Sequence, residues 1–286
     1  MKKILPVVFS LLAVIAAPSF SGVKGTLFII GGGDRPESMM RRFVDLAGRF
    51  GRGKIVVFPM ASSEPAETGA RLAAEFKGLG AREAEFFVLT REQALVEGNV
   101  RLLDDVGAVF FSGGDQARQM DVLRGTPIHR RLLELYQEGC VMAGTSAGAA
   151  VMSEVMITGE ERRKAEEGHE FETLEADNIV TVEGLGFLKT AIIDQHFATR
   201  KRHNRLISLV AEHPRLLGIG IDEETAIVVG PDDQFEVIGN RNVVVYDASN
   251  AEVTITPSKA VGFHGMKMHV LLAGDRFDLE RREAVR

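Results

Sequence analysis

Residues 140–150 read CVMAGTSAGAA, an apolar run that passes through Gly-x-Ser-x-Gly into small residues. This pattern predicts a buried strand, a tight turn and the start of a helix, with the Ser146 side chain projecting out of a sheet. A helix over 127–138, with Pro127 in its first turn and Gly139 at its end, delivers the chain into this strand. The strand, the turn and the serine are therefore expected to form one structural unit.

Short apolar runs alternate with helical patterns on the N-terminal side of this unit. The strands are expected at 26–30, 54–58, 85–89 and 108–111, and the helices at 36–49, 65–79, 91–95, 99–104 and 115–123. This rhythm predicts an α/β fold, a three-layer α/β/α sandwich with a mostly parallel central sheet. Six β-type runs follow residue 215, at 218–221, 226–229, 235–238, 243–246, 253–256 and 268–272. We expect them to be antiparallel strands that close one edge of the sheet.

Composition limits the classes of partner. The chain has 286 residues, 45% of them hydrophobic, and a net charge of −6 without a long basic run, which argues against nucleic acid and favours a small or peptidic substrate. The single cysteine, Cys140, cannot form an internal disulfide and is expected to be a buried structural thiol. No linker divides residues 22–286, so we expect a single catalytic domain. The sequence leaves the oligomeric state open, a homodimer included.

The first 21 residues have the three parts of a secretory signal peptide. Lys2 and Lys3 precede an apolar run from Ile4 to Ala17, and small residues follow at a cleavage site. The apolar run is shorter than the roughly 20 residues that a spanning helix needs. We therefore expect a cleaved signal, a secreted or periplasmic mature protein, and no membrane association after cleavage.

Ser146 is the candidate nucleophile. The turn also directs the backbone amide of Ala147 and the positive end of the new helix towards a developing oxyanion. The alternative is a glycine-rich packing turn without chemistry, because Gly-x-Ser-x-Gly also occurs by chance.

A serine hydroxyl needs a base and the base needs a carboxylate. Of seven histidines, only His196 ends an apolar strand, in the run TAIIDQHF, where parallel sheets place functional groups. The alternative role for His196 is a hydrogen-bonded strand-end histidine. The acid is expected in the run GIGIDEET, although sequence alone does not separate Asp222, Glu223 and Glu224.

Further glycine and arginine motifs surround these candidates. Gly114, in the run FFSGGDQ, is a candidate second oxyanion donor and Gln116 a candidate substrate contact, the alternative being a simple turn. The run Gly31-Gly32-Gly33 lacks dinucleotide-binding spacing, because Pro36 occupies the last position, and we expect neither a cofactor nor a metal.

The charged segment 159–178 is expected to be a solvated surface loop, with a flap over the site as the alternative. Solvated helix surface and carboxylate recognition both remain open for three arginines, Arg200, Arg202 and Arg205.

Together these motifs resemble the cyanophycinases, in the serine peptidase family that also holds aspartyl dipeptidase and has a glutamine-amidotransferase-like fold. The resemblance rests on FIIGGG, FFSGGDQ, AGTSAGA, IIDQHFATRKRHNRL and GIGIDEETA, in that order. It implies Ser146 as nucleophile, His196 as base and Glu223 as acid. It also implies a set of substrate-binding residues, namely Gln116, Asp194, Gln195, Arg200, Arg202 and Arg205.

The resemblance implies an exported exopeptidase that hydrolyses cyanophycin, a polyaspartate bearing arginine on each β-carboxylate, to β-Asp-Arg dipeptides through an acyl-enzyme on Ser146. Two alternatives stay open. One is a dipeptidase for short aspartyl peptides, and the other is an exported binding protein that has lost turnover.

Overall fold

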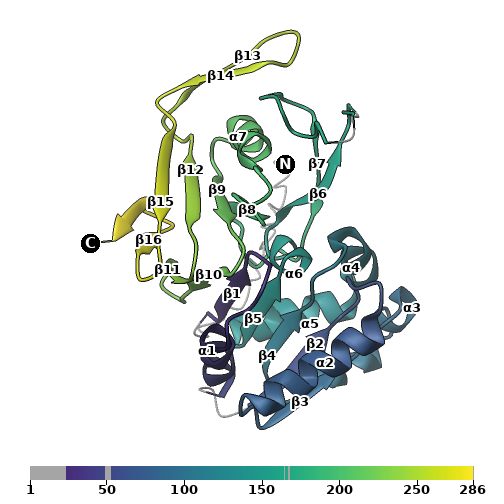
Figure 1. Ribbon diagram of the computed structural model, residues 1–286. Helices are drawn as coiled ribbons and strands as arrows, with labels where there is room; N and C mark the ends of the chain where they lie inside the picture. The colour runs from purple at the N-terminus through teal and green to yellow at the C-terminus, as the bar shows by residue number, and fades with distance from the viewer. Residues whose placement is uncertain (1–23, 49–52, 164, 167, 286) are drawn as a thin grey trace, which may run out of the picture.

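The computed structural model describes residues 24–48, 53–163, 165, 166 and 168–285 (Figure 1). The signal peptide predicted for residues 1–21 lies outside the described residues. No helix in the described ranges is long and apolar enough to cross a membrane. The helices are α1 Glu37–Gly48, α2 Pro65–Gly78, α3 Arg91–Ala94, the 3₁₀ helix η1 Glu97–Leu103, α4 Gln116–Leu123, α5 Pro127–Gln137, α6 Ala147–Ala150 and α7 His203–Glu212.

The main sheet has nine strands in the order β17-β16-β11-β10-β1-β5-β4-β2-β3. The five strands from β1 to β3 in this order are parallel to one another, whereas β10, β11, β16 and β17 pair antiparallel. The parallel strands are β1 Thr26–Ile30, β5 Val141–Thr145, β4 Val106–Phe111, β2 Lys54–Phe58 and β3 Glu83–Phe86. The antiparallel strands are β10 Thr225–Val229, β11 Gln234–Gly239, β16 Arg276–Asp278 and β17 Glu283–Val285. The predicted α/β class is confirmed.

Both faces of the main sheet are buried. Along β1, Phe28 and Ile30 pack with α1 and α2 in one core, whereas Leu27 and Ile29 pack with α4, α5 and α6 in another. Because strand side chains alternate between faces, a strand that is covered on both sides reads as a continuous apolar run. Helices therefore cover both faces of the main sheet, and these are the three layers that the apolar runs predicted.

The C-terminal strands depart from the prediction that they close one edge of a single sheet. Of the six predicted runs, only β10 and β11 join the main sheet, where β16 and β17 extend the same antiparallel edge, whereas β9, β12 and β15 lie in a second, four-stranded sheet of order β15-β12-β9-β8. The strands of this sheet are β8 Ala191–Gln195, β9 Leu217–Ile221, β12 Val243–Asp247 and β15 Lys267–Leu271. One face of the second sheet shares the core of the main sheet and the other face packs against α7. The prediction is confirmed for β10 and β11 and wrong for the other four runs, because an apolar pattern identifies a strand but not its partner.

Two antiparallel ribbons complete the fold, β6 Val155–Glu161 with β7 Ile179–Glu183, and β13 Glu252–Ile255 with β14 Val261–His264. Residues 159–161 of the predicted surface loop belong to β6. The other described residues of the segment are largely exposed, but its end contacts the rest of the fold: the amide of Ala176 donates to the Lys259 carbonyl at 2.9 Å, and that of Glu175 to Ser208 Oγ at 3.1 Å. The segment is therefore a loop fixed at its C-terminal end.

Candidate active site

Ser146 stands on a strained turn at the end of β5. Its φ is 53° and its ψ is −113°, a conformation that non-glycine residues rarely adopt and that costs on the order of 1–3 kcal/mol. The amide of Ser146 donates to the Ile30 carbonyl at 3.0 Å. The two motif glycines let the turn form, since a Cβ on Gly144 would lie 2.1 Å from the Gly148 carbonyl oxygen, and one on Gly148 would lie 2.1 Å from that of Phe111.

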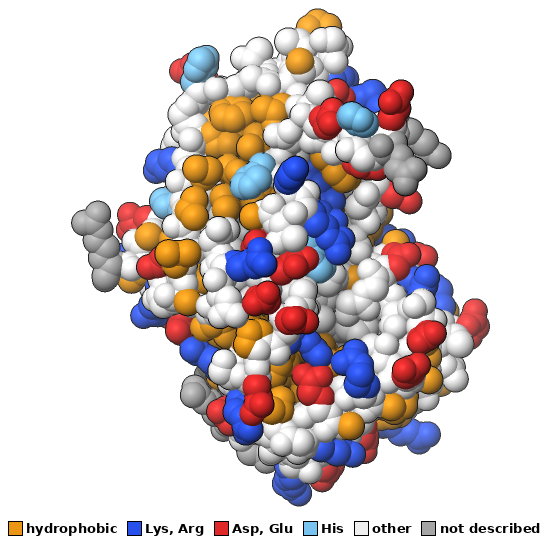
Figure 2. All heavy atoms as spheres, in the orientation of Figure 1, with side chains coloured by type: hydrophobic (Ala, Val, Ile, Leu, Met, Phe, Trp, Pro, Cys, Tyr) orange, Lys and Arg blue, Asp and Glu red, His pale blue; other side chains and the backbone are white. Residues whose placement is uncertain are grey.

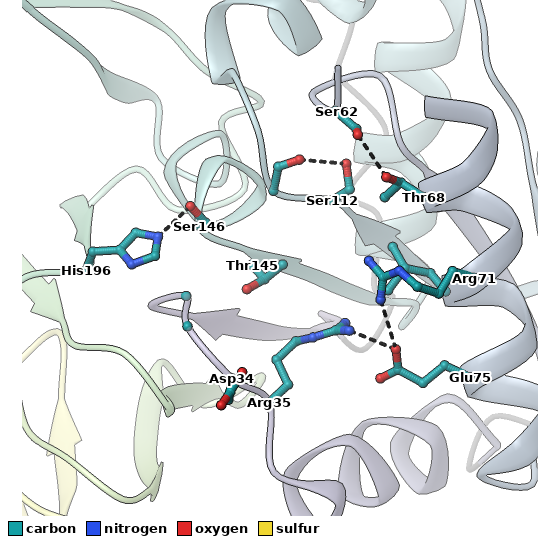
Figure 3. Close-up of a pocket in the computed structure, with 14 residues that line it drawn as sticks. Asp34, Arg35, Ser62, Thr68, Arg71, Glu75, Ser112, Thr145, Ser146 and His196 are labelled. Carbon is teal, nitrogen blue, oxygen red and sulfur yellow. Dashed lines mark hydrogen bonds and ion pairs between the residues drawn. The ribbon is translucent and has the colours of Figure 1, made fainter. Parts of the chain in front are cut away.

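His196 follows β8 in the second sheet, so the two candidate catalytic residues come from different sheets. Its φ is also positive, at 48°, and its amide donates to the Gly31 carbonyl at 2.7 Å, which attaches it to the end of β1. Its Nε2 lies 2.8 Å from Ser146 Oγ (Figure 3), a distance at which the hydroxyl donates its proton to the ring nitrogen. The loop after β1 is thus the bridge between the two halves of the site.

Glu223 completes the chain of hydrogen bonds. It lies in the short turn from β9 to β10, and its Oε1 accepts from His196 Nδ1 at 2.6 Å. The structure separates the three acids that sequence could not, because Asp222 accepts the amide of Thr199 at 2.9 Å and Glu224 accepts from Asn240 at 3.0 Å. Glu223 alone faces the imidazole and fixes the tautomer with Nε2 free to accept the serine proton.

Burial sets the protonation state of His196. Desolvation holds its pKa below the ordinary value, Glu223 acts in the opposite direction, and the charges of Arg200 and Arg202 lower it further. The imidazole is therefore neutral at pH 7, the form that a general base requires.

Three glycines after β1 leave space for this chain of side chains. A Cβ on Gly32, whose φ is +114°, would lie 2.4 Å from the His196 ring, and one on Gly33, whose φ is +69°, would lie 2.8 Å from Glu223 Cβ. The spacing of these glycines argues against a dinucleotide site, but it indicates no other role for them. Their neighbours lie far away in the sequence, so only the fold could reveal one.

Two segments beside Ser146 have backbone amides without an acceptor among the residues described. Within the ranges that the structure describes, the amides of Gly113, Gly114 and Ala147 donate to no other group. Gly113 faces the nucleophile, because a Cβ there would lie 3.4 Å from Ser146 Cβ, whereas Gly114 packs against the Ala61 carbonyl. Gly113 is therefore an additional candidate oxyanion donor that sequence analysis missed, beside the predicted Gly114 and Ala147.

A cavity of about 370 Å³ on one side of Ser146 contains most of the predicted substrate-binding residues. We call it the arginine cavity. The guanidinium of Arg202 donates to the Gln195 carbonyl at 2.7 Å, and burial, followed by the charge of Arg205, lowers its pKa to about 10. Gln116 donates to the Ile157 and Thr158 carbonyls at 3.0 and 2.6 Å, and so attaches β6 to the rim of the cavity. Arg200 is exposed and lines the same cavity.

Asp194 and Arg205 are not available for the predicted contact with substrate. The Asp194 side chain is fully buried and that of Arg205 is 2% exposed, and they form a bidentate ion pair in which Arg205 Nε donates to Asp194 Oδ2 at 2.7 Å. Asp194 also accepts the amide of Gln195 at 2.8 Å. The attraction to Arg205 offsets the free-energy cost of burying the Asp194 carboxylate, so the pair has a structural role behind the wall of the site.

A larger cavity of about 620 Å³ opens on the other side of Ser146 (Figure 3). We call it the α2 cavity, because α2 forms its far wall. Its charged lining residues are Asp34, Arg35, Arg71 and Glu75. Their role could not be predicted from the sequence, because Asp34 and Arg35 lie in the loop after β1, and charges on a helix, such as Arg71 and Glu75, usually indicate a solvated face. In the space-filling view, basic and acidic side chains lie together around the centre of the face (Figure 2).

Known proteins share this fold and much of this sequence. The family model of peptidase family S51 matches residues 27–238, which include Ser146, His196 and Glu223. A cyanophycinase of Trichormus variabilis is 36% identical over 270 residues, covering 91% of this chain and 87% of the relative. A cyanophycinase of Geminocystis herdmanii is 33% identical over 266 residues, covering 90% of this chain and 94% of the relative.

Solved structures agree on the fold. A peptidase from an acI-B1 actinobacterium superposes with a TM-score of 0.63 at 24% identity, covering 89% of this chain and 97% of that one. A putative peptidase E from Listeria monocytogenes gives a TM-score of 0.51 at 16% identity, covering 76% of this chain and 98% of that one. The fold, the sequence relatives and the family match agree, and the chain belongs to peptidase family S51 as a serine-type peptidase.

Proposed function

We propose that this peptidase is an exported cyanophycinase, an exopeptidase that releases β-Asp-Arg dipeptides from cyanophycin. One observation carries the proposal: the hydrogen-bonded chain Ser146–His196–Glu223 opens between two cavities lined by charged side chains. Cyanophycin presents a guanidinium and a carboxylate on every unit, which charged cavities can bind. The relatives named cyanophycinase, at 32–36% identity over about nine-tenths of this chain, support the same substrate.

In the proposed mechanism, Ser146 Oγ attacks the backbone carbonyl of an aspartyl unit while His196 Nε2 accepts the hydroxyl proton. Glu223 stabilises the imidazolium that forms, and amides of Ala147 and of the Gly113-Gly114 pair bind the oxyanion. The imidazolium then protonates the leaving amine, which breaks the amide bond and leaves an ester on Ser146. Water hydrolyses this ester with His196 again as the base.

Incubation with insoluble cyanophycin granules tests the proposal. We expect β-Asp-Arg as the product from the earliest time points, detected by mass spectrometry, with Ser146→Ala as the control for contaminating activity. Intermediate-sized fragments would contradict an exopeptidase. Cleavage of short aspartyl peptides without release from granules would indicate a dipeptidase instead.

A binding protein without turnover is distinguished by a covalent probe. A fluorophosphonate reacts with an activated serine, so we expect labelling of Ser146 that Ser146→Ala abolishes. Granule binding without labelling or product would replace the peptidase assignment.

The proposed export rests on residues 1–21. Expression of the full chain in a Gram-negative host should place the protein in the periplasm or the medium, with an intact mass that lacks the N-terminal segment. A protein of full mass retained in the cytoplasm would contradict export.

A further inference from the structure

The α2 cavity contains charges of both signs, and two of its four charged side chains, Arg35 and Glu75, compensate each other. Arg35 Nη2 donates to Glu75 Oε2 at 2.7 Å (Figure 3). The guanidinium carbon of Arg35 also lies 5.7 Å from the centre of the Phe110 ring. Arg71 approaches the same Glu75 oxygen only to 3.9 Å. Arg35 and Glu75 therefore form a fixed pair, and Arg71 keeps hydrogen-bond donors for a ligand.

Asp34 is the acid of this cavity that remains free. Among the residues that the structure describes, it has no hydrogen-bond donor and no ion-pair partner, and it is exposed. It follows Gly33, which packs against Glu223, so it lies on the wall of the cavity that carries the catalytic chain. Arg71 lies on α2 at the far wall. The cavity thus presents a free carboxylate, Asp34, and an open guanidinium, Arg71, from opposite sides, whereas the one unbonded terminal nitrogen of Arg35, Nη1, is buried.

We propose that the α2 cavity binds an arginyl arm of the substrate, with Asp34 receiving its guanidinium and Arg71 its α-carboxylate. An arginine that is linked through its α-amine keeps both of these charged groups, the positive guanidinium and the negative α-carboxylate. The arginine cavity beyond Ser146, with Arg200 and Arg202 on its lining, suits a carboxylate of the neighbouring unit. This inference rests on the proposed function and extends it, because it names the side chains that recognise arginine.

Three synthetic oligomers with β-linked side arms test the two contacts separately. The arms are arginine, citrulline, which keeps the carboxylate but has no positive charge, and agmatine, which keeps the guanidinium but has no carboxylate. A charge-assisted hydrogen bond contributes about 1.5–3 kcal/mol, or roughly tenfold or more in kcat/KM. Wild type should prefer arginine over each analogue by at least that factor.

Single substitutions should remove these preferences one at a time. Asp34→Asn is expected to abolish discrimination between arginine and citrulline, and Arg71→Gln to abolish discrimination between arginine and agmatine. Asp45→Asn and Arg82→Gln are matched controls, because both side chains are exposed and neither lines a cavity at Ser146. All four variants should keep the wild-type rate of fluorophosphonate labelling at Ser146.

Unchanged preferences in Asp34→Asn and Arg71→Gln, with normal wild-type cleavage of the arginine oligomer, would overturn this inference alone. Failure of wild type to cleave the arginine oligomer and granules would overturn the proposed function together with the inference. Slower labelling in Asp34→Asn would show that it acts through Glu223 rather than through the arm, and would also overturn its assigned contact.

Discussion

The two residues that face each other across the site are held by different physical means. Ser146 stands on a turn where backbone packs directly on backbone: Gly144 lies against Gly148, and Gly148 against Phe111. His196 follows two residues that belong to a network of charged and polar groups, in which Arg205 pairs with Asp194 and Arg202 donates to the Gln195 carbonyl. Close backbone packing thus holds Ser146 in place, and charged groups hold His196 in place. Added bulk and removed charge should therefore have different effects on the two residues.

Removing the nucleophile should cause the largest loss of activity, and it should disturb the structure of neither the Ser146 turn nor the surroundings of His196. Ser146→Ala deletes one hydroxyl at a site where the backbone already has its strained conformation, so we expect loss of about 10⁴-fold or more in kcat with an unchanged melting temperature. Granule hydrolysis and calorimetry measure both. Activity within tenfold of wild type, from protein free of contaminants, would exclude Ser146 as the nucleophile.

Glu223→Gln should cause the second largest loss of activity, because it removes the negative charge beside the base His196 while keeping the shape of the side chain. Loss of the triad carboxylate typically costs about 10³–10⁴-fold in kcat. The hydrogen bond to Glu223 raises the pKa of His196, so its loss should lower that pKa further and move the acid limb of the kcat/KM profile to lower pH. A limb that stays in place or moves to higher pH would contradict this role for Glu223.

Arg205→Met tests whether charge supports the base side. The substitution keeps much of the side-chain volume but leaves Asp194 buried without its partner, which typically costs about 3–5 kcal/mol of unfolding free energy. Denaturant unfolding measures the loss, and the neutral pair Asp194→Asn with Arg205→Met should recover part of it. A raised KM with unchanged stability would restore the original prediction of direct contact with substrate.

The fate of this pair shows which parts of the site can be predicted from sequence. Strands that are buried on both faces read as apolar runs, and the ends of such strands supplied Ser146 and His196. The sequence pattern could not show that β8 lies in the second sheet, since strands of both sheets are buried on both faces and read as the same kind of apolar run. It also could not distinguish a buried arginine such as Arg205 from an exposed one such as Arg200, because burial depends on residues distant in the sequence.

Gly32 is a second case of this kind, and it provides a test of shape on the base side. In Gly32→Ala, the new methyl group would press on the imidazole and displace it from Ser146, and misplacement by about 1 Å can cost roughly 100-fold in rate. Gly80→Ala is the matched control, because its φ of +101° imposes the same backbone cost with no neighbour within 4 Å. Equal kcat in both variants would show that the contact with His196 has no catalytic weight.

The smallest expected effect concerns the charge of Arg200, whose backbone amide donates to the His196 carbonyl at 2.9 Å but whose guanidinium forms no hydrogen bond among the described residues. Arg200 lowers the pKa of His196, so Arg200→Gln should raise that pKa and move the acid limb to higher pH, opposite to Glu223→Gln. The rate of Ser146 labelling by an uncharged fluorophosphonate, followed against pH, reports this shift without any contribution from substrate binding. Because Arg200 is exposed, the shift should shrink as salt is added, whereas the effect of the buried Glu223 contact should persist. If salt left the Arg200 shift unchanged, the arginine would act through the structure of the turn rather than through its charge, and the division between a side fixed by shape and a side fixed by charge would fail there.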